Sequence, residues 1–358
     1  ESVLAWNFWS LFAFRLGVGV GEASCAPTAS SLIGDLFPPE RRARAMAIFM
    51  IGLPLGLAVS SVLSGVIAQR YGWQAAFCIP AFPGLLLALA ALGIEDTPRG
   101  QADRIAPAHK PAPFLDSLRA VLSRPTMWWI IISGALHNFN MYALGTFLTS
   151  VIRRYHHLDS SGAGLASGLV WGIGALGMFL AGWLGDVVYR RRQSGRLEVS
   201  CGAIALAVPL ILLGLAVPPG NPWRFAFWLV LTYAMMSAFY GTVYAAIQDI
   251  IEPALRGTAM AVYFFAMYML GAILGPVATG WISDHFALRA AEAAGVTVTL
   301  AASGRPAVPD EFRAIGLHQA MYVVPVLSVV LVLVLFAASR TVGGDRQRLL
   351  NRVEASRS

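Results

Sequence analysis

An arginine and a glutamate lie inside the first apolar stretch of the chain, in the run RLGVGVGEASCAP. Arg15 and Glu22 are seven residues apart, about 10.5 Å along a helix, so both side chains would lie on one helical face. A charged side chain at membrane depth costs about 2.5–3.5 kcal/mol, which makes both residues candidates for function. We expect Glu22 to take up a proton or meet a cationic group, and Arg15 to hold an anionic headgroup. The alternative is a static salt bridge between helices.

Uncharged polar side chains in later apolar stretches form a second candidate group. His137 and Asn140 share one face of a predicted helix. Tyr240, Tyr244 and Gln248 recur every four residues in another, which also places them on one face. These residues are predicted to line a cavity and contact substrate. For each of them the alternative is an ordinary hydrogen bond between helices.

Charged residues at the ends of the apolar stretches form a third group. In GWLGDVVYRRR, the Asp186 carboxylate can cap the N-terminus of a neighbouring helix. Arg190 and Arg191 are expected to reach the acidic end of another helix, such as Asp249. Such a cluster would hold the cytoplasmic side of the protein shut until a conformational change breaks it, whereas the alternative is interfacial anchoring. The predicted gate residues are Asp35, Arg42, Gly182, Asp186, Arg190, Arg191, Asp249 and Arg256.

Membrane helices must position these residues, because the composition excludes a soluble fold. The 358 residues are 57% apolar and 13% charged, whereas a soluble chain carries about 25% charged residues. A helix needs about 20 predominantly apolar residues to span a bilayer. Nine stretches qualify: 8–36, 43–69, 73–94, 127–152, 162–187, 198–217, 222–250, 257–284 and 317–338.

The basic residues predict how these helices cross the bilayer. Of the 26 Lys and Arg residues, 18 fall on one side, seven fall on the other, and Arg15 lies inside a stretch. Basic residues concentrate in cytoplasmic loops, so the C-terminus is predicted to be cytoplasmic, in a multi-pass protein of the plasma (inner) membrane. The net charge of +7 is therefore interpreted as a topology signal, and we expect no nucleic-acid partner.

The chain also repeats itself at an offset of 214 residues. Residues 35–47 and 249–261 share six identities in thirteen positions, and parallel repeats are a known transporter architecture. The three stretches between 127 and 217 have no upstream partner, which predicts an N-terminally truncated twelve-helix protein. The predicted organisation is 1–94 as helices four to six of an N-terminal bundle, 95–125 as a cytoplasmic linker, 126–341 as a six-helix C-terminal bundle and 342–358 as a cytoplasmic tail.

Other classes of chemistry lack their residues. An ATP-binding phosphate loop needs lysine after glycine, but the single lysine, Lys110, follows His109. The three cysteines have neither metal-ligand nor disulfide spacing, and no nucleophile–base set appears. We therefore expect a monomer in the lipid bilayer that is no enzyme, uses no ATP, metal or cofactor, and takes a small-molecule substrate. A membrane receptor or enzyme without transport is the alternative of another class.

Several longer runs resemble the major facilitator superfamily. RLGVGVGEASCAPTASSLIGDLFPPERRARAMAIF is similar to its fourth helix and the loop that follows. GWLGDVVYRRR resembles the loop between helices eight and nine, with Tyr189 where glycine is usual. The segments GVGEA, GLPLG, IQDIIEPALRGTAMA and GPVATGWISD are most similar to the spinster-like branch. The resemblance covers residues 1–340.

The resemblance implies an all-α integral membrane protein with the major facilitator fold, in which nine transmembrane helices are present and the first three are lacking. It implies a secondary transporter whose two bundles rock around a central cavity, with proton coupling and an amphipathic lipid substrate such as a lysophospholipid or a sphingosine phosphate. Arg15 and Glu22 match the functional arginine and glutamate of the branch. The acidic site of the first helix is not carried over. The runner-up is an exporter of drugs or organic anions from the same superfamily.

Overall fold

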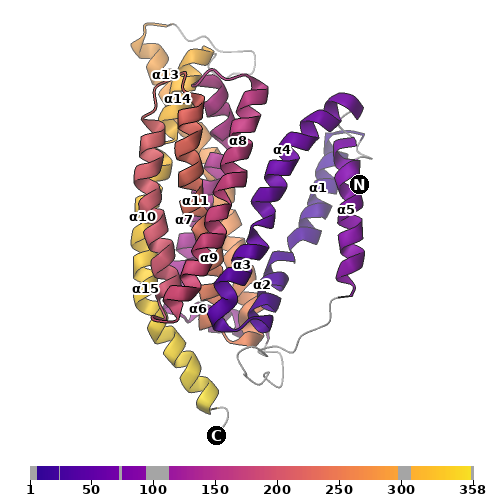
Figure 1. Cartoon of the computed structure of the whole chain (residues 1–358), viewed down its shortest axis with the longest axis vertical. Coiled ribbons are helices and arrows are strands. Elements are labelled where there is room, and N and C mark those ends of the chain that lie inside the picture. Colours follow the sequence, from indigo (N-terminus) through magenta and orange to yellow (C-terminus); the bar gives the residue numbers. More distant parts are fainter. Residues whose placement is uncertain (1–5, 24, 72–74, 94–112, 297–307, 356–358) are drawn as a thin grey trace.

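The computed structural model describes residues 6–23, 25–71, 75–93, 113–296 and 308–355. All regular secondary structure in these ranges is helical. The helices form two groups that stand side by side, one from each part of the chain (Figure 1). The all-helical prediction is therefore confirmed.

The N-terminal group consists of apolar helices that are broken by glycine and proline. Only Ile51 separates α3 from α4, directly before the run GLPLG. Pro54 has no N–H to donate to the preceding turn, so the chain can change direction there. The elements are α1 (Phe8–Ala23), α2 (Cys25–Leu36), the 3₁₀ turn η2 (Pro39–Arg41), α3 (Arg42–Met50), α4 (Gly52–Tyr71) and α5 (Ala75–Ala91).

The C-terminal group surrounds one central helix, α11. All side chains from Met236 to Ile250 are buried, and α11 packs against α8, α9, α10 and α3. The α9 and α11 backbones touch, because a Cβ at Gly177 would collide with the carbonyl oxygen of Ala234. The elements are α6 (Phe114–Leu122), α7 (Pro125–Arg154), α8 (Ser160–Gly174), α9 (Leu176–Tyr189), α10 (Gly195–Leu215), α11 (Pro222–Ile250), the 3₁₀ turn η4 (Pro253–Leu255), α12 (Arg256–Ala266), the π-helical segment η5 (Met267–Ala272), α13 (Leu274–Ala293), α14 (Asp310–Ala320) and α15 (Val323–Ala355).

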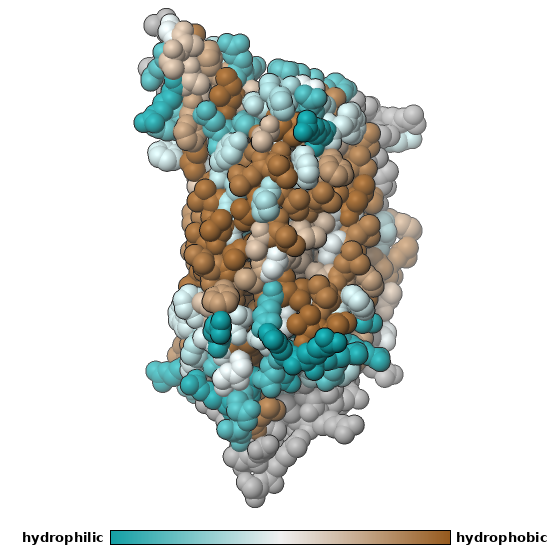
Figure 2. Space-filling view, turned by 60° about the vertical axis from the view of Figure 1, so that its left-hand side comes forward, coloured by the Kyte–Doolittle hydropathy of each residue, from teal (hydrophilic) through white to brown (hydrophobic). Residues whose placement is uncertain are grey.

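The outer surface matches the hydrocarbon core of a bilayer. Figure 2 shows a hydrophobic belt with hydrophilic residues above and below it. Large apolar side chains such as Val277 and Leu333 are 67% and 64% exposed, which suits contact with acyl chains. Within the described ranges, six helical segments are long and apolar enough to cross a membrane: Pro39–Ser60, Gly162–Tyr189, Gly195–Leu215, Pro222–Ile250, Pro253–Ala293 and Asp310–Asn351.

Helix α15 continues past the predicted boundary between bundle and tail at residue 341. It leaves the helix group at the end of the molecule where α3 begins, here called the α3 end (Figure 1). Asp345 explains the continuation, because its carboxylate accepts the backbone N–H of Thr126 (2.9 Å) and caps α7. Its carbonyl oxygen also accepts a hydrogen bond from Arg124 (3.2 Å). The first part of the predicted tail is therefore a packed helix, and residues 95–112 of the predicted linker lie outside the described ranges.

The opposite end contains a buried histidine. His156, between α7 and α8, is 2% exposed, and its ring lies 4.6 Å from that of Phe225 and 5.1 Å from that of Tyr155. Burial, and to a smaller degree the charges of His318 and His157, lower the pKa of His156 from 6.5 to about 4. The folded protein therefore holds this imidazole neutral at pH values where the unfolded chain would protonate it.

We predict that acid destabilises the protein through His156. Stability should fall as the pH drops through 6.5 and level off below about 4, because the unfolded state binds the proton first. Between pH 7.5 and 5 the loss is about 2 kcal/mol, measured as a lower Tm in detergent. The substitution His156→Gln should flatten this profile. As a control, His157→Asn should not, since His157 is exposed and has a φ of 56° that asparagine tolerates. An unchanged profile in His156→Gln would refute the assignment.

Candidate functional site

Two buried salt bridges join the helix groups at the α3 end. Arg42 Nη1 lies 3.3 Å from Asp249 Oδ1, and Arg256 Nη1 lies 3.1 Å from Asp35 Oδ1. At the repeat offset of 214, Asp35 corresponds to Asp249 and Arg42 to Arg256. The arginine of each repeat thus pairs with the aspartate of the other, which is the exchange that a twofold relation between the repeats produces.

The same two arginines bind helix ends. The carbonyl oxygen of Gly34, near the end of α2, accepts from Arg42 Nη2 (2.7 Å) and from Arg256 Nη1 (3.0 Å). Arg256 Nε donates to the carbonyl oxygen of Gln248 near the end of α11 (3.2 Å). Cations at helix C-termini are favourable, so these contacts reinforce the ion pairs. A Cβ at Gly34 would lie 2.8 Å from Gln248 Oε1, so a larger residue at position 34 would require the Gln248 side chain to move.

Asp186 links the end of α9 to the beginning of α3. Its two carboxylate oxygens accept the backbone N–H groups of Ala43 (3.1 Å) and Arg44 (3.0 Å). This is the cap on a neighbouring helix that the sequence predicts. Asp186 Oδ1 also pairs with Arg196 Nη2 at 2.9 Å, and both side chains are 1% exposed. Arg196 in turn contacts the Asp249 carboxylate and the carbonyl oxygen of Pro39. One arginine on α10 therefore ties α9, α11 and the turn before α3 together.

Small residues allow α3 to sit directly on α9 and α11. A Cβ at Gly182 would lie 2.7 Å from Ala47 Cβ and 2.8 Å from the carbonyl oxygen of Ala43. A Cβ at Gly241 would lie 3.0 Å from Ala47 Cβ. The backbones of the two groups are thus in van der Waals contact here, and a larger side chain would separate them.

The structure brings most of the predicted gate residues together, but one pairing differs from the prediction. Arg190 and Arg191 are exposed, and the contact with Asp249 expected of them is made by Arg196 instead. Arg196 was not predicted, because the sequence offers four arginines between 190 and 196 and gives no sign of which one turns inward. Six residues form the ion-pair cluster: Asp35, Arg42, Asp186, Arg196, Asp249 and Arg256.

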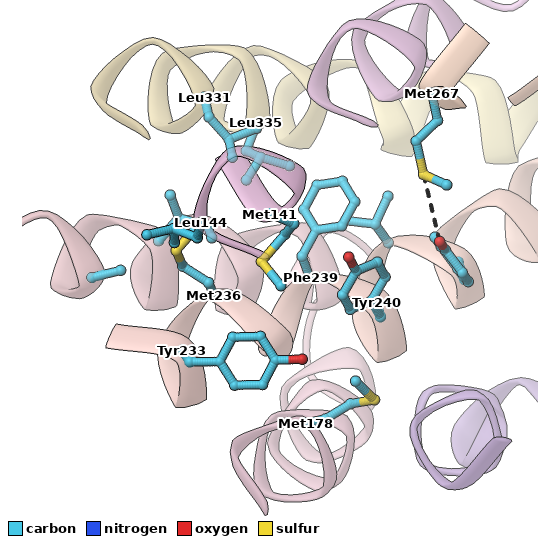
Figure 3. Close-up of a cluster of buried hydrophobic side chains, with 14 of the residues drawn as sticks. Met141, Leu144, Met178, Tyr233, Met236, Phe239, Tyr240, Met267, Leu331 and Leu335 are labelled. Atoms are coloured by element: carbon cyan, nitrogen blue, oxygen red, sulfur yellow. Dashed lines mark hydrogen bonds between the residues drawn. The ribbon is translucent and has the colours of Figure 1, made fainter. Parts of the chain in front are cut away.

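A cavity of about 610 Å³ lies between the two helix groups and is lined by residues of α3, α4, α7, α8, α9 and α11. Met50 on α3, Met178 on α9 and Tyr240 on α11 line the cavity. Each of them lies within about one helical turn of the residues through which these three helices touch. Figure 3 shows Met141, Met178, Tyr233 and Tyr240 as neighbours. The described lining residues are Met50, Leu53, Pro54, Leu57, Met141, Tyr142, Gly145, Thr146, Thr149, Gly164, Ser167, Trp171, Met178, Tyr233 and Tyr240.

The cavity wall is apolar and aromatic, with a few hydroxyl groups. None of the described lining residues carries a formal charge. Thr149 and Ser167 share a hydrogen bond of 2.9 Å across α7 and α8. Such a wall accommodates an apolar body and offers neutral hydrogen bonds for orientation.

The predicted cavity residues take different positions. Tyr240 lines the cavity, and His137 lies behind it, stacked on Phe239 (4.1 Å) with its ring edge-on to Tyr240 (5.0 Å). Both His137 ring nitrogens are buried without a hydrogen-bond partner among the described residues. Asn140 makes an ordinary hydrogen bond between helices, which is the alternative to substrate contact expected from the sequence. Its side-chain amide donates to Ser328 Oγ on α15 (3.1 Å).

The remaining predicted residues lie deeper or outside the described part. Tyr244 donates to Met267 Sδ at 3.6 Å, the dashed line in Figure 3. The Gln248 amide is buried against Gly34, and neither of its polar atoms has a partner among the described residues. Arg15 and Glu22 both belong to α1, but their side chains lie outside what the structure describes.

The comparisons with known proteins give the family. The family model of the Major Facilitator Superfamily matches residues 2–208, more than half of the chain. The chain belongs to this superfamily. It is similar to a bacterial homolog of the human lysosomal transporter spinster in an inward-facing, unoccupied conformation, with a TM-score of 0.65 and 25% identity over 96% of this chain and 80% of that one. The major facilitator fold and the transporter family expected from the sequence are therefore confirmed.

Sequence relatives within the superfamily are transporters of several kinds. The chain is 28% identical to an MFS-type efflux pump of Mycolicibacterium smegmatis, covering 75% of this chain and 62% of the pump. It is 24% identical to protein spinster homolog 1 of Bos taurus, covering 78% of this chain and 56% of that protein. A hexuronate transporter of Bacillus subtilis is also 24% identical, covering 79% of this chain and 68% of the transporter. The chain thus spans about 55–70% of the length of these curated relatives.

Proposed function

We propose that the protein is a secondary transporter that works by alternating access, and that its solute is lipid-like and amphipathic or an organic anion. One observation carries the proposal: a cavity lies between the two helix groups, and at the α3 end the arginine of each repeat forms a salt bridge with the aspartate of the other. The ion-pair cluster would be the gate at that end, and the described conformation would be the one in which this gate is shut. Breaking the cluster would let the groups rock apart and open the cavity to the other side.

The chemistry of the gate suits repeated opening. The aspartates and arginines of the cluster are buried in the shut state, where each charge depends on its partners. When the gate opens, water can solvate the same charges, so the loss of the ion pairs is partly offset. The cluster therefore stabilises the shut state without making it permanent.

The substrate class follows from the cavity wall. Met, Tyr and Trp side chains with a few hydroxyls fit an acyl chain or an aromatic body. We propose that Arg15 and Glu22 on α1 bind the charged end of the solute and carry proton coupling. The match to spinster-like proteins supports a lysolipid. The match to an efflux pump supports the second candidate, export of a drug or organic anion. We further propose that the α3 end faces the cytoplasm, because most arginines gather there.

Counterflow in proteoliposomes tests this proposal. With unlabelled lysophospholipid inside, the reconstituted protein should accumulate labelled lysophospholipid, and an imposed pH gradient should change the rate. The substitution Glu22→Gln should lower the rate about tenfold or more and remove its pH dependence. Glu292→Gln, an exposed site on α13, is the matched control and should transport normally. If the protein exchanges organic anions but no lysophospholipid, the second candidate function, export of a drug or organic anion, is the correct one. No exchange of any solute would refute transport.

A further inference from the structure

Tyr189, the last residue of α9, touches both the gate and the C-terminal helix. Its ring is 6% exposed. The guanidinium carbon of Arg196 lies 3.9 Å from the ring centroid, and that of Arg346 on α15 lies 4.9 Å from it. Both distances are within the range of a cation–π interaction, which is strongest where water is excluded. One aromatic ring thus joins Arg196 of the ion-pair cluster to the part of α15 that follows residue 341, which is called the extension of α15.

A second set of contacts leads from the same extension to the gate. Arg124 Nη1 donates to the carbonyl oxygen of Asp345, and its Nη2 lies 3.4 Å from Glu252 Oε1. Glu252 follows the gate residue Asp249 by three positions and precedes the turn η4. The extension of α15 is therefore linked to the neighbourhood of the gate at two points, through the Arg346–Tyr189 contact and indirectly through Arg124.

Arg196 depends on its surroundings for orientation. The guanidinium NH₂ groups donate hydrogen bonds to the Asp186 and Asp249 carboxylates and to the Pro39 carbonyl oxygen. The Arg196 Nε has no partner among the described residues. A flat ring against the guanidinium restricts the planes that this group can adopt. Loss of the ring would let Arg196 rotate away from one of its three acceptors.

We infer that Tyr189 is a positioning residue of the gate, and that the extension of α15 strengthens the shut state through Arg346 and Tyr189. This inference rests on the proposed gate. It assigns the C-terminal helix a regulatory contact, because anything that draws Arg346 away from Tyr189 would weaken the hold on Arg196.

The test measures access to a buried position behind the gate. Ser30 on α2 is fully buried, four residues before Gly34. In a cysteine-free background, Ser30→Cys would report labelling by a membrane-impermeant maleimide applied to each membrane side in turn. Tyr189→Leu and Arg346→Gln should each raise labelling from the α3 end about tenfold, while Tyr189→Phe, which keeps the ring, should not. The matched control is Arg340→Gln on the same helix, whose guanidinium lies 4.8 Å from the ring of the exposed Phe336.

A gate-breaking variant separates the two ideas. If Gly182→Val raises labelling but Tyr189→Leu and Arg346→Gln do not, the inference is wrong and the gate stands. If Gly182→Val also has no effect, the proposed gate itself is wrong. Equal effects of Tyr189→Phe and Tyr189→Leu would assign the role to the hydroxyl group and overturn the cation–π explanation.

Discussion

Replacing Gly182 by valine is expected to expose the interior of the protein from the α3 end. Even the first added carbon would lie 2.8 Å from the carbonyl oxygen of Ala43, and a backbone atom cannot swing aside as a side chain can. Helix α3 must then move away from α9. Overpacking of this kind costs about 1–3 kcal/mol, which shifts the equilibrium by about five- to 150-fold. Maleimide labelling of Ser30→Cys from the α3 end should rise accordingly.

The neighbouring helix provides the control for Gly182→Val. A Cβ at Gly202 on α10 meets nothing within 4 Å, so Gly202→Val has the same change in helix propensity without the collision. Gly182→Ala should give an intermediate increase in labelling, and a normal melting curve in detergent would establish that both variants fold. Labelling of a folded Gly182→Val protein at the parental rate would rule out close packing of α3 on α9 as part of the gate.

The substitution Asp186→Ala should have the second large effect. It removes one of the two carboxylates that pair with the buried Arg196, and it removes the acceptor of two N–H groups at the beginning of α3. Arg196 keeps Asp249 as its counter-charge, so the lost charge-assisted hydrogen bond costs about 1.5–3 kcal/mol, and loss of a helix cap costs about 1 kcal/mol. Because water can reach these groups only after the gate opens, the variant should favour the open state by about a hundredfold. Transport that requires both states should then be nearly lost.

An aspartate at the other end separates this effect from a general change in charge. Asp284 on α13 is exposed, and Asp284→Ala should leave both labelling and transport unchanged. Asp186→Asn keeps one acceptor oxygen for an α3 N–H, so its labelling should lie between the parent and Asp186→Ala. An Asp186→Ala protein that remains shut would show that Asp186 only anchors α9.

The fold class and the aspartates of the ion-pair cluster could be predicted because the bilayer restricts what the chain can do. Only closed hydrogen-bonded structures span lipid, so length and composition already select helices. Aspartates at the ends of apolar stretches stand out, and the repeat shows which ones correspond. Arg196 could not be found in this way. Arg190, Arg191 and Arg196 look alike in the sequence, and only the tight turn before α10 decides which guanidinium is buried.

The cavity was harder to predict, because periodicity gives the face of a helix but not the depth along it. Tyr240 and Gln248 share a face of α11, yet Tyr240 meets the cavity and Gln248 meets Gly34. Asn140 finds its partner, Ser328, 188 residues further along the chain. Cavity residues such as Trp171 are apolar, and in the sequence nothing distinguishes them from residues that face acyl chains.

The contact between Gly34 and Gln248 bears on how the two halves diverged. The offset of 214 makes these residues equivalent, and equivalent positions can meet only beside the axis that relates the copies. In an ancestor with identical halves the same side chain would stand on both sides: two glutamines would have to share the space that Gln248 now fills, and two glycines would leave that space empty. After gene duplication, one copy could become small and the other large. In the present chain the two halves meet closely beside this axis because Gly34 is small and the Gln248 side chain fills the space next to it.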